Sequence, residues 1–367
     1  MSSPPFEGPA PDPGGVTFNV RDEGDRLAAV TLHQELMRPR RGPPFARAPD
    51  SSTWTVRLGR PPADRMEYRL EIKEHGSRIQ VMCDPANPLR APGPFGDKSV
   101  VQWPEYGPPR WLDCDAGDRA GSSRRIAISS RALAATFDVV IWGTSGDSGS
   151  TPQPLLVAHD GPEYDSYSCL TRFLAWAVDE GRLPPLRAAL LPPIDRNHSY
   201  SASGVYAYAL AKEILPALET VAPMPGHNGR IGMGASLGAL AMMHAHRSYP
   251  DSFDALFLQS GSFFVPHLDP QESRFPRWDR ITRFVERLID DSRPIRRIPI
   301  AMTCGAAEEN LANNRLTAKA LQAQGYDCSL HEHRDAHNWV SWRDSFDPPL
   351  VDLAARVWGG RSGEKDG

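Results

Sequence analysis

The most informative stretch of this sequence is Arg230-Ile-Gly-Met-Gly-Ala-Ser-Leu-Gly-Ala-Leu-Ala-Met-Met-His-Ala-His246. It begins as a short apolar strand, passes through the pattern G-x-S-x-G at residues 234–238, and continues as a helix. A serine at such a strand-to-helix junction sits in a strained turn, which needs small neighbours where Cβ atoms would collide. We therefore predict that Ser236 is a nucleophile and that the backbone N–H of Leu237 donates to an oxyanion. A glycine-rich turn with an idle serine is the alternative.

Around this motif, short apolar runs alternate with helical patterns across residues 125–358, as is typical of a parallel sheet wrapped by helices. The expected strands are 125–129, 137–142, 154–159, 187–191, 230–234, 254–259, 298–304 and 327–333. The expected helices are 171–180, 205–219, 237–249, 277–290 and 313–324. The serine motif follows the fifth of these eight strands.

The hydrophobic pattern of residues 16–112 differs from that of the later region. Apolar and polar residues alternate there with a period of two. The clearest strands are 16–20, 28–32, 54–58 and 66–72. This pattern predicts a β-sandwich domain before the α/β domain. The Pro/Gly-rich residues 1–15 are predicted to be disordered, as is the tail 359–367, and residues 113–124 are predicted to be a linker.

Composition excludes several classes of protein. The 367 residues are 40% hydrophobic and 23% charged, with 30 glycines, 36 prolines and a net charge of −4, which gives no electrostatic reason to expect nucleic acid as a partner. The N-terminal residues lack the basic and apolar regions of a secretory signal, and no apolar run is long enough to span a membrane. The five cysteines show no CxxC spacing. We expect a cytoplasmic protein with reduced cysteines, no metal and no cofactor, and neither nucleic acid nor membrane as a partner.

A serine hydroxyl needs a base, and in hydrolases of this architecture the chain order is serine, acid, histidine. Of the eleven histidines, His331, His333 and His337 lie in the C-terminal region. His331 and His333 share one face of the last expected strand, and as a metal pair they lack a third ligand of suitable spacing. His337 lies in the loop beyond that strand, so we predict that it is the base.

The acid should follow the seventh strand, where Glu308 and Glu309 occur. We predict Glu308, in the first turn after Gly305, and Glu309 remains the alternative. Asp335 is disfavoured, because it lies only two residues before His337. The acid would fix the imidazole tautomer and stabilise the imidazolium.

The second oxyanion donor should come from the loop after the third strand. Pro162 has no N–H, so Gly161 or Glu163 must donate, and we predict Gly161.

These residues resemble the esterase D-like family of α/β-hydrolases, and more closely its enterochelin (enterobactin) esterase branch. The matching elements are His159-Asp-Gly161, Gly234-x-Ser236-x-Gly238, Glu308-Glu-Asn310, Asn313-Asn-Arg315, His337-Asn-Trp339, Trp342-Arg343 and Glu213-Ile-Leu-Pro216. The resemblance covers residues 112–350, and the region before it resembles the immunoglobulin-like (early-set) domain that precedes the catalytic domain in that branch. It implies an α/β-hydrolase sheet with flanking helices that acts as a serine carboxylic-ester hydrolase.

The resemblance also implies a small-molecule ester as substrate, in that branch the trilactone of a ferric catecholate siderophore, opened through an acyl-enzyme on Ser236. It implies substrate contacts from Arg196 and Trp339, although an ordinary ion pair is the alternative for Arg196. Ser199 stands where family members often carry Glu. An acyltransferase on the same fold, a non-catalytic binding protein and a lid within residues 262–297 remain open, as does the oligomeric state.

Overall fold

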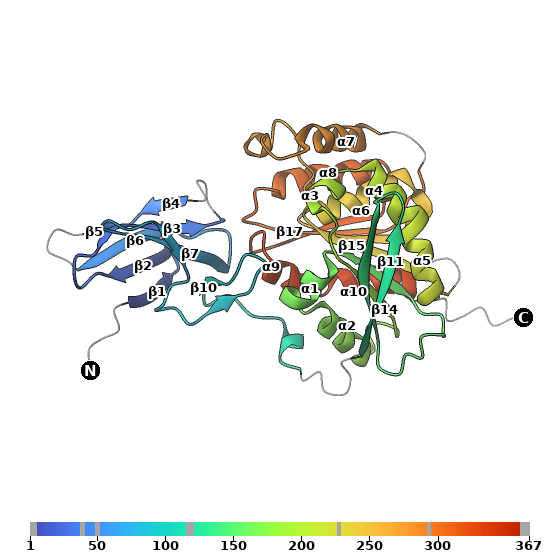
Figure 1. Cartoon of the computed structure of the whole chain (residues 1–367), viewed down its shortest axis with the longest axis horizontal. Coiled ribbons are helices and arrows are strands. Elements are labelled where there is room, and N and C mark those ends of the chain that lie inside the picture. The colour runs from blue at the N-terminus through green and yellow to red at the C-terminus, as the bar shows by residue number, and fades with distance from the viewer. Residues whose placement is uncertain are drawn as a thin grey trace, which may run out of the picture. The chain divides into compact units, whose positions relative to one another are not determined.

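The computed structural model describes residues 6–36, 41–47, 52–114, 121–225, 229–291 and 295–359 (Figure 1). The chain divides into two compact units. The first, which we call the β unit, contains Met1–Pro108, Gly305–Glu308 and His333–Ser341. The second, the α/β unit, contains Pro109–Cys304, Glu309–Glu332 and Trp342–Gly367. The domain boundaries predicted from the sequence did not assign the two short C-terminal segments to the β unit.

The N-terminal part of the β unit consists of two antiparallel sheets, with the orders β1-β2-β6-β5 and β4-β3-β7-β10-β9, and β8 pairs with β7. The strands are β1 Phe6–Asp12, β2 Gly15–Arg21, β3 Leu27–Gln34, β4 Arg41–Pro44, β5 Ala46–Arg47, β6 Thr53–Gly59, β7 Arg65–Glu74, β8 Gln80–Met82, β9 Arg90–Ala91 and β10 Lys98–Gln102. The four predicted strands are confirmed as parts of β2, β3, β6 and β7. Because alternate side chains of a strand share a face, their apolar residues fill one core, which includes Phe18, Tyr68 and Val101.

The prediction of disorder was wrong for residues 6–12. They form β1, which pairs antiparallel with β2 in the register Asp12↔Gly15. An edge strand tolerates Pro9 and Pro11, because the outward positions of its backbone need no N–H donor. The predicted linker was also too long, since residues 122–124 already belong to β11. The predicted tail from residue 360 onward, residues 1–5 and linker residues 115–120 lie outside the described residues.

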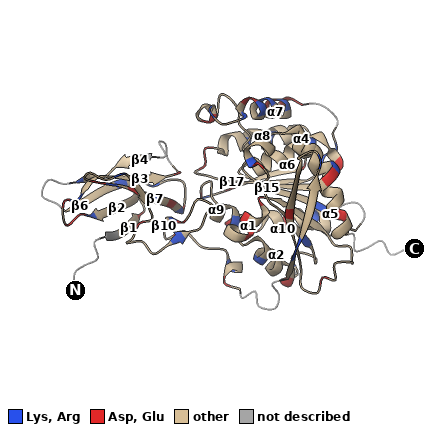
Figure 2. Ribbon diagram, viewed as in Figure 1, with Lys and Arg blue, Asp and Glu red and all other residues tan. Residues whose placement is uncertain are grey.

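An eight-stranded sheet forms the centre of the α/β unit, with the order β11-β12-β14-β13-β15-β16-β17-β18. The strands are β11 Ser122–Ser130, β12 Ala135–Gly143, β13 Leu155–His159, β14 Arg187–Leu191, β15 Arg230–Ala235, β16 Ala255–Gln259, β17 Ile300–Gly305 and β18 Cys328–His333. All eight predicted strands are confirmed, with small shifts at their ends. The β14-β13-β15-β16-β17 part is parallel, whereas β12 runs antiparallel to both β11 and β14. β13, β16 and β17 contain no Lys, Arg, Asp or Glu, as expected for strands buried on both faces, and β17 is tan in Figure 2.

The helices of the α/β unit cover both faces of this sheet. They are α1 Gly161–Ser168, α2 Leu170–Asp179, α3 Arg196–Ser199, α4 Gly204–Ala209, α5 Leu215–Val221, α6 Leu237–Ser248, α7 Trp278–Asp290, α8 Leu311–Ala323, α9 Trp339–Asp344, whose first residues belong to the β unit, and α10 Pro349–Trp358. Figure 1 shows α6 and α8 on one face and α1, α2 and α10 on the other. The five predicted helices are confirmed, and the one expected at 205–219 contains α4, a π-helical turn and α5. None of the helices described here has the length and apolar character needed to cross a membrane.

Candidate active site

The turn between β15 and α6 holds Ser236 in an unusual backbone conformation, with φ 57° and ψ −122°. A Cβ on Gly234 would lie 2.5 Å from the carbonyl carbon of Gly238, so the turn cannot form with a larger residue there. The Ser236 N–H donates to the carbonyl oxygen of Gln259 over 2.9 Å, which ties the turn to the end of β16. Surrounding structure therefore maintains a strained serine, as the sequence pattern predicts.

The Ser236 side chain is half-buried, and its Oγ lies 3.1 Å from the Oγ of Ser262. Leu237 begins α6, so its N–H belongs to the first turn, where backbone donors have no partner within the helix. The positive end of the helix dipole lies at the same place. The turn thus combines a hydroxyl with backbone donors, which suits attack on a carbonyl and stabilisation of the resulting oxyanion.

Gly161, the other predicted oxyanion donor, begins α1 directly after β13. It is buried, and a Cβ there would lie 2.3 Å from the Cα of Leu190, so only glycine fits. Its N–H is also a first-turn donor, and Pro162 follows without one. Which N–H completes an oxyanion hole stays a prediction, and Glu163 remains the alternative.

His159, at the end of β13, holds the backbone of the serine turn through a hydrogen bond to Gly238. Its Nδ1–H donates to the carbonyl oxygen of Gly238 over 3.0 Å, which leaves Nε2 to accept from the hydroxyl of Tyr206 over 2.9 Å. Burial lowers the pKa of His159 to about 4, so the ring is neutral near pH 7. This histidine supports the turn, a role that sequence reasoning missed, although its position as the last residue of a buried strand was a usable signal.

Gln259 is a second supporting residue that sequence reasoning missed. Its side chain accepts a hydrogen bond from Tyr164 over 2.7 Å and donates to Ser345 Oγ over 2.9 Å. All three residues are buried, and such fully bonded polar networks hold a backbone rigidly. No sequence pattern connects the three positions.

Arg196, predicted to contact substrate, begins α3 and forms a two-pronged ion pair with Asp160. Its Nε lies 3.0 Å and one Nη 2.8 Å from the carboxylate. Asp160 is buried, whereas about a third of the Arg196 side chain is exposed (34%). The ion pair considered as the alternative is therefore present, and a substrate contact by Arg196 stays a prediction.

Glu308 and His337, both in the β unit, lie in direct contact. The Nδ1–H of His337 donates to Oε2 of Glu308 over 2.8 Å, and Oε1 of Glu308 accepts the N–H of Gly305 over 2.8 Å. The Glu308 side chain is fully buried, while 34% of the His337 side chain is exposed. A carboxylate so placed orients the ring with Nε2 outward, the geometry required of a general base.

The other residues considered as acid or base lie elsewhere. His333 bonds to Ser341 Oγ over 2.6 Å, and His331 is exposed. Asp335 is buried against Arg65; burial raises the pKa of its carboxyl, and the charge of Arg65 opposes that shift. Trp339, predicted to contact substrate, opens α9 and is half-buried, and its contact with substrate stays a prediction.

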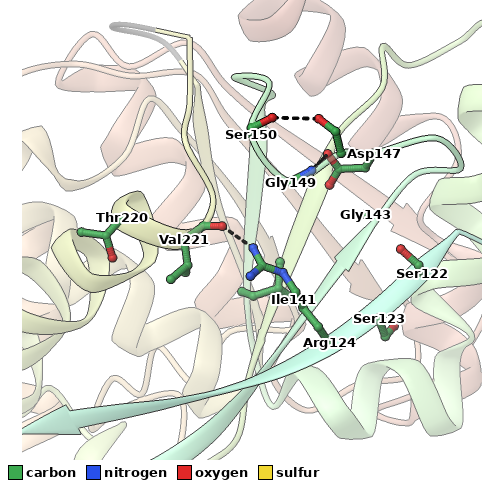
Figure 3. A pocket seen from close by; sticks show the side chains of 11 residues that line it. Ser122, Ser123, Arg124, Ile141, Gly143, Asp147, Gly149, Ser150, Thr220 and Val221 are labelled. Atoms are coloured by element: carbon green, nitrogen blue, oxygen red, sulfur yellow. Dashed lines mark hydrogen bonds between the residues drawn. The ribbon is translucent and has the colours of Figure 1, made fainter.

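A cavity of ≈ 490 Å³ lies beside β11, β12 and the end of α5 (Figure 3). None of the predicted site residues lines it. Arg124 donates to the carbonyl oxygen of Val221, and Asp147 is paired with Arg187, so the charged groups there already have partners. The described residues that line this cavity include no histidine to serve as a base, and we assign it no chemistry.

Comparison with known families and proteins gives a consistent match. Residues 143–353 match the model of the family described as "Putative esterase". The iron(III) enterobactin esterase of Escherichia coli O6:H1 (strain CFT073) is 25% identical over 361 residues, which cover 92% of this chain and 87% of that protein. The iron(III) enterobactin esterase of Escherichia coli strain K12 is 25% identical over 304 residues, covering 80% and 73%.

Solved structures show the same fold. The crystal structure of the Shigella flexneri enterobactin esterase in the presence of enterobactin superposes with a TM-score of 0.75 at 19% identity, covering 97% of this chain and 96% of that one. A ferulic acid esterase superposes with a TM-score of 0.54 at 16% identity, covering 65% and 99%. The first match extends over both units, while the second covers only part of the chain.

Proposed function

We propose that this chain, which belongs to the esterase family and is an ester hydrolase, acts through an acyl-enzyme formed on Ser236. The observation that carries the proposal is the backbone of the serine turn, with φ 57° at Ser236 and glycines required beside it. A non-glycine residue in such a conformation is costly, and strain of this kind is concentrated at functional sites.

In the proposed reaction, Ser236 Oγ attacks the ester carbonyl while His337 Nε2 takes the hydroxyl proton. The oxyanion of the tetrahedral intermediate receives hydrogen bonds from the N–H groups of Leu237 and Gly161. The C–O bond of the ester then breaks, and His337 returns the proton to the departing alkoxide. A water molecule, deprotonated by His337, attacks the acyl-enzyme, and the free acid leaves as Ser236 regains its proton.

The contact between Glu308 and His337 supports these roles. A buried carboxylate that accepts from Nδ1–H keeps the proton on Nδ1 and leaves Nε2 as the base. The order of the strands supports them too, because ligands of open α/β sheets bind outside the carboxyl ends of the strands. Ser236 follows β15, Gly305 ends β17 and His337 follows β18.

For the substrate, we propose a triester of the catecholate siderophore class, because the two relatives that align with most of the chain are named iron(III) enterobactin esterases. The exposed part of Arg196 would face an anionic group of this substrate, and Trp339 one of its rings. Ser199, which stands where Glu is common in that branch, makes a different ester the competing outcome.

We further propose a cytoplasmic location, with neither nucleic acid nor membrane as a partner. None of the five cysteines, all of which lie in the described residues, forms a disulfide, as in a reducing compartment, and the net charge of −4 offers no attraction to polyanions. For the N-terminal sheets we propose the immunoglobulin-like (early-set) class. Their two-sheet antiparallel arrangement supports this assignment.

A substrate panel tests the proposal. Ferric and iron-free triscatecholate trilactones, feruloyl esters and short acyl esters are incubated with the protein, with Ser236→Ala and with Ser248→Ala, and the products are separated by chromatography. Ser248 is a matched control, because it is an exposed serine at the far end of the same helix. We expect the highest kcat/KM on a trilactone and its loss only in Ser236→Ala. Preference for a feruloyl or short acyl ester would refute the substrate class, and turnover by Ser236→Ala would refute the mechanism.

A further inference from the structure

The loop that carries His337 is built into the β unit through Arg65, the first residue of β7. Arg65 is 2% exposed, and its Nη1 donates to Asn338 Oδ1 over 3.0 Å and lies 3.5 Å from Asp335 Oδ2. One guanidinium therefore contacts a residue on each side of His337.

The two residues that Arg65 contacts also shape the turn between them. Asp335 Oδ1 accepts the N–H of Ala336 over 2.7 Å and the side-chain amide of Asn338 over 3.1 Å. Asn338 Oδ1 accepts the N–H of Ser341 over 2.8 Å as well. The turn that presents His337 is thus closed by two side chains, and Arg65 holds both of them.

Further contacts from the N-terminal sheets attach the same loop at its ends. The N–H of Asp64 donates to the carbonyl oxygen of Arg334 over 2.9 Å, and the Asp64 carboxylate pairs with the Arg334 guanidinium over 2.9 Å. Val340 packs in a small apolar cluster with Ala91 and Val100. These contacts lie three residues before and three after His337.

The segment that carries Glu308, the acid of the proposed triad, also contacts Asp335. The N–H of Ala307 donates to the carbonyl oxygen of Asp335 over 3.1 Å, and a Cβ on Gly305 would lie 2.4 Å from that oxygen. A movement of Asp335 would therefore disturb the 2.8 Å contact between Glu308 and His337. Catalytic groups must stay within about 0.5 Å of their productive geometry, so such a movement is costly.

The charges around Arg65 favour this arrangement. Glu67 Oε1 accepts from Nη2 over 3.0 Å, and Lys98 lies 3.3 Å from the other oxygen of Glu67. Although burial disfavours a charged guanidinium, the attraction of Asp335 and Glu67 keeps the pKa of Arg65 above its ordinary value. Arg65 therefore stays charged, and its planar fork directs N–H donors from separate nitrogens to Asn338 and Glu67, whereas a lysine would offer donors from a single nitrogen.

We propose that Arg65 is a positioning residue for His337, so that the N-terminal sheets are part of the catalytic apparatus. The inference rests on the proposed function of His337 as the base. It predicts that loss of Arg65 slows the chemical step without weakening substrate binding, because Arg65 acts through the loop and not on the substrate.

The test compares Arg65→Met, Arg65→Lys and Arg187→Met in the full-length chain. Arg187 is a matched control, because it is equally buried and paired with a carboxylate but lies in β14 of the α/β unit. We expect Arg65→Met to lower kcat on a p-nitrophenyl ester 10- to 100-fold with KM changed less than threefold, and to slow fluorophosphonate labelling in proportion. Arg65→Lys should restore part of the rate, and Arg187→Met should stay within threefold of the wild type.

A spectroscopic measurement separates positioning from general loss of stability. The proton shared by His337 and Glu308 gives a far-downfield proton NMR signal, which is assigned by its absence in His337→Ala. We expect this signal to broaden or vanish in Arg65→Met and to persist in Arg187→Met. A folded Arg65→Met protein with a normal kcat and a retained signal would overturn the inference.

Two further variants keep the test decisive. If Arg65→Met does not fold, Asn338→Ala replaces it, because this variant removes the main acceptor of Arg65. It should lower kcat at least 10-fold with little change in KM. An unchanged kcat would overturn the inference. If His337→Ala itself keeps wild-type turnover, the proposed function has failed, whatever Arg65 does.

Discussion

Replacing Glu308 by glutamine changes one atom of a buried side chain and should abolish most of the activity. In the wild type, one carboxylate oxygen accepts the N–H of Gly305 and the other accepts Nδ1–H of His337, each over 2.8 Å. A glutamine has one acceptor oxygen and one donor amide, so it can satisfy only one of these two donors.

Both orientations of the glutamine are unfavourable. With its oxygen toward Gly305, its NH₂ group faces His337 Nδ1 and selects the tautomer that has the proton on Nε2, which cannot act as a base. With its oxygen toward His337, two donors face each other at Gly305, and a buried unpaired donor costs about 1–3 kcal/mol. The first orientation therefore prevails. The carboxylate-to-amide change in a serine triad costs on the order of 10⁴ in kcat, or about 5.4 kcal/mol of transition-state stabilisation.

The assay measures kcat and KM for a p-nitrophenyl ester with wild type, Glu308→Gln and Glu309→Gln. Glu309 is the matched control, because it is the adjacent carboxylate and the alternative acid. We expect about a 10³–10⁴-fold loss of kcat for the first variant and less than a threefold change for the second. More than a tenth of wild-type activity in Glu308→Gln, or a larger loss in Glu309→Gln, would refute the reasoning.

Three further predictions follow from the same structure. Gly234→Ala places a Cβ 2.5 Å from the backbone across the serine turn. It should lower the free energy of unfolding by about 1–3 kcal/mol and lower kcat more than tenfold. In the control Gly204→Ala, the new Cβ has no atom within 4 Å, so both quantities should stay unchanged. Burial lowers the pKa of His246 to about 4, so its contribution to stability, full above pH 6.5, is lost as pH falls toward 4. Chemical denaturation should show that His246→Gln reduces the pH slope of the unfolding free energy there by about 1.4 kcal/mol per unit, and an unchanged slope would contradict this. Arg196→Met leaves the buried Asp160 carboxylate unpaired and should cost about 1–3 kcal/mol on denaturation, and if Arg196 also contacts substrate, KM should rise for anionic but not neutral esters.

The elements of the α/β unit were predictable because their signals are local. Apolar runs at strand length and a helix beginning directly after Ser236 are visible within windows of ten to twenty residues. The prediction failed at β1, where Pro9 and Pro11 suggested disorder. Pairing with β2, which the composition of this segment does not reveal, supplies its hydrogen bonds.

Candidate site residues could be proposed from the sequence only where the chemistry restricts the order of residues along the chain. The order serine, acid, histidine leads to Ser236, a glutamate after the seventh strand and His337. The sequence alone does not distinguish Glu308 from Glu309 as the acid, because only the folded backbone decides which of them faces the histidine. Arg65 could not be found from the sequence, since 270 residues separate it from Asp335. No periodicity or motif records a contact of that range.

The central claim is that Ser236 forms the acyl-enzyme, and one labelling experiment tests it directly. Residues 231–247 form a single tryptic peptide in which Ser236 is the only hydroxyl side chain, while Ser262 lies in the following peptide. After reaction with a fluorophosphonate, the mass of the adduct should be found on peptide 231–247 and disappear in Ser236→Ala. An adduct on the peptide that carries Ser262, or labelling that survives in Ser236→Ala, would contradict the account.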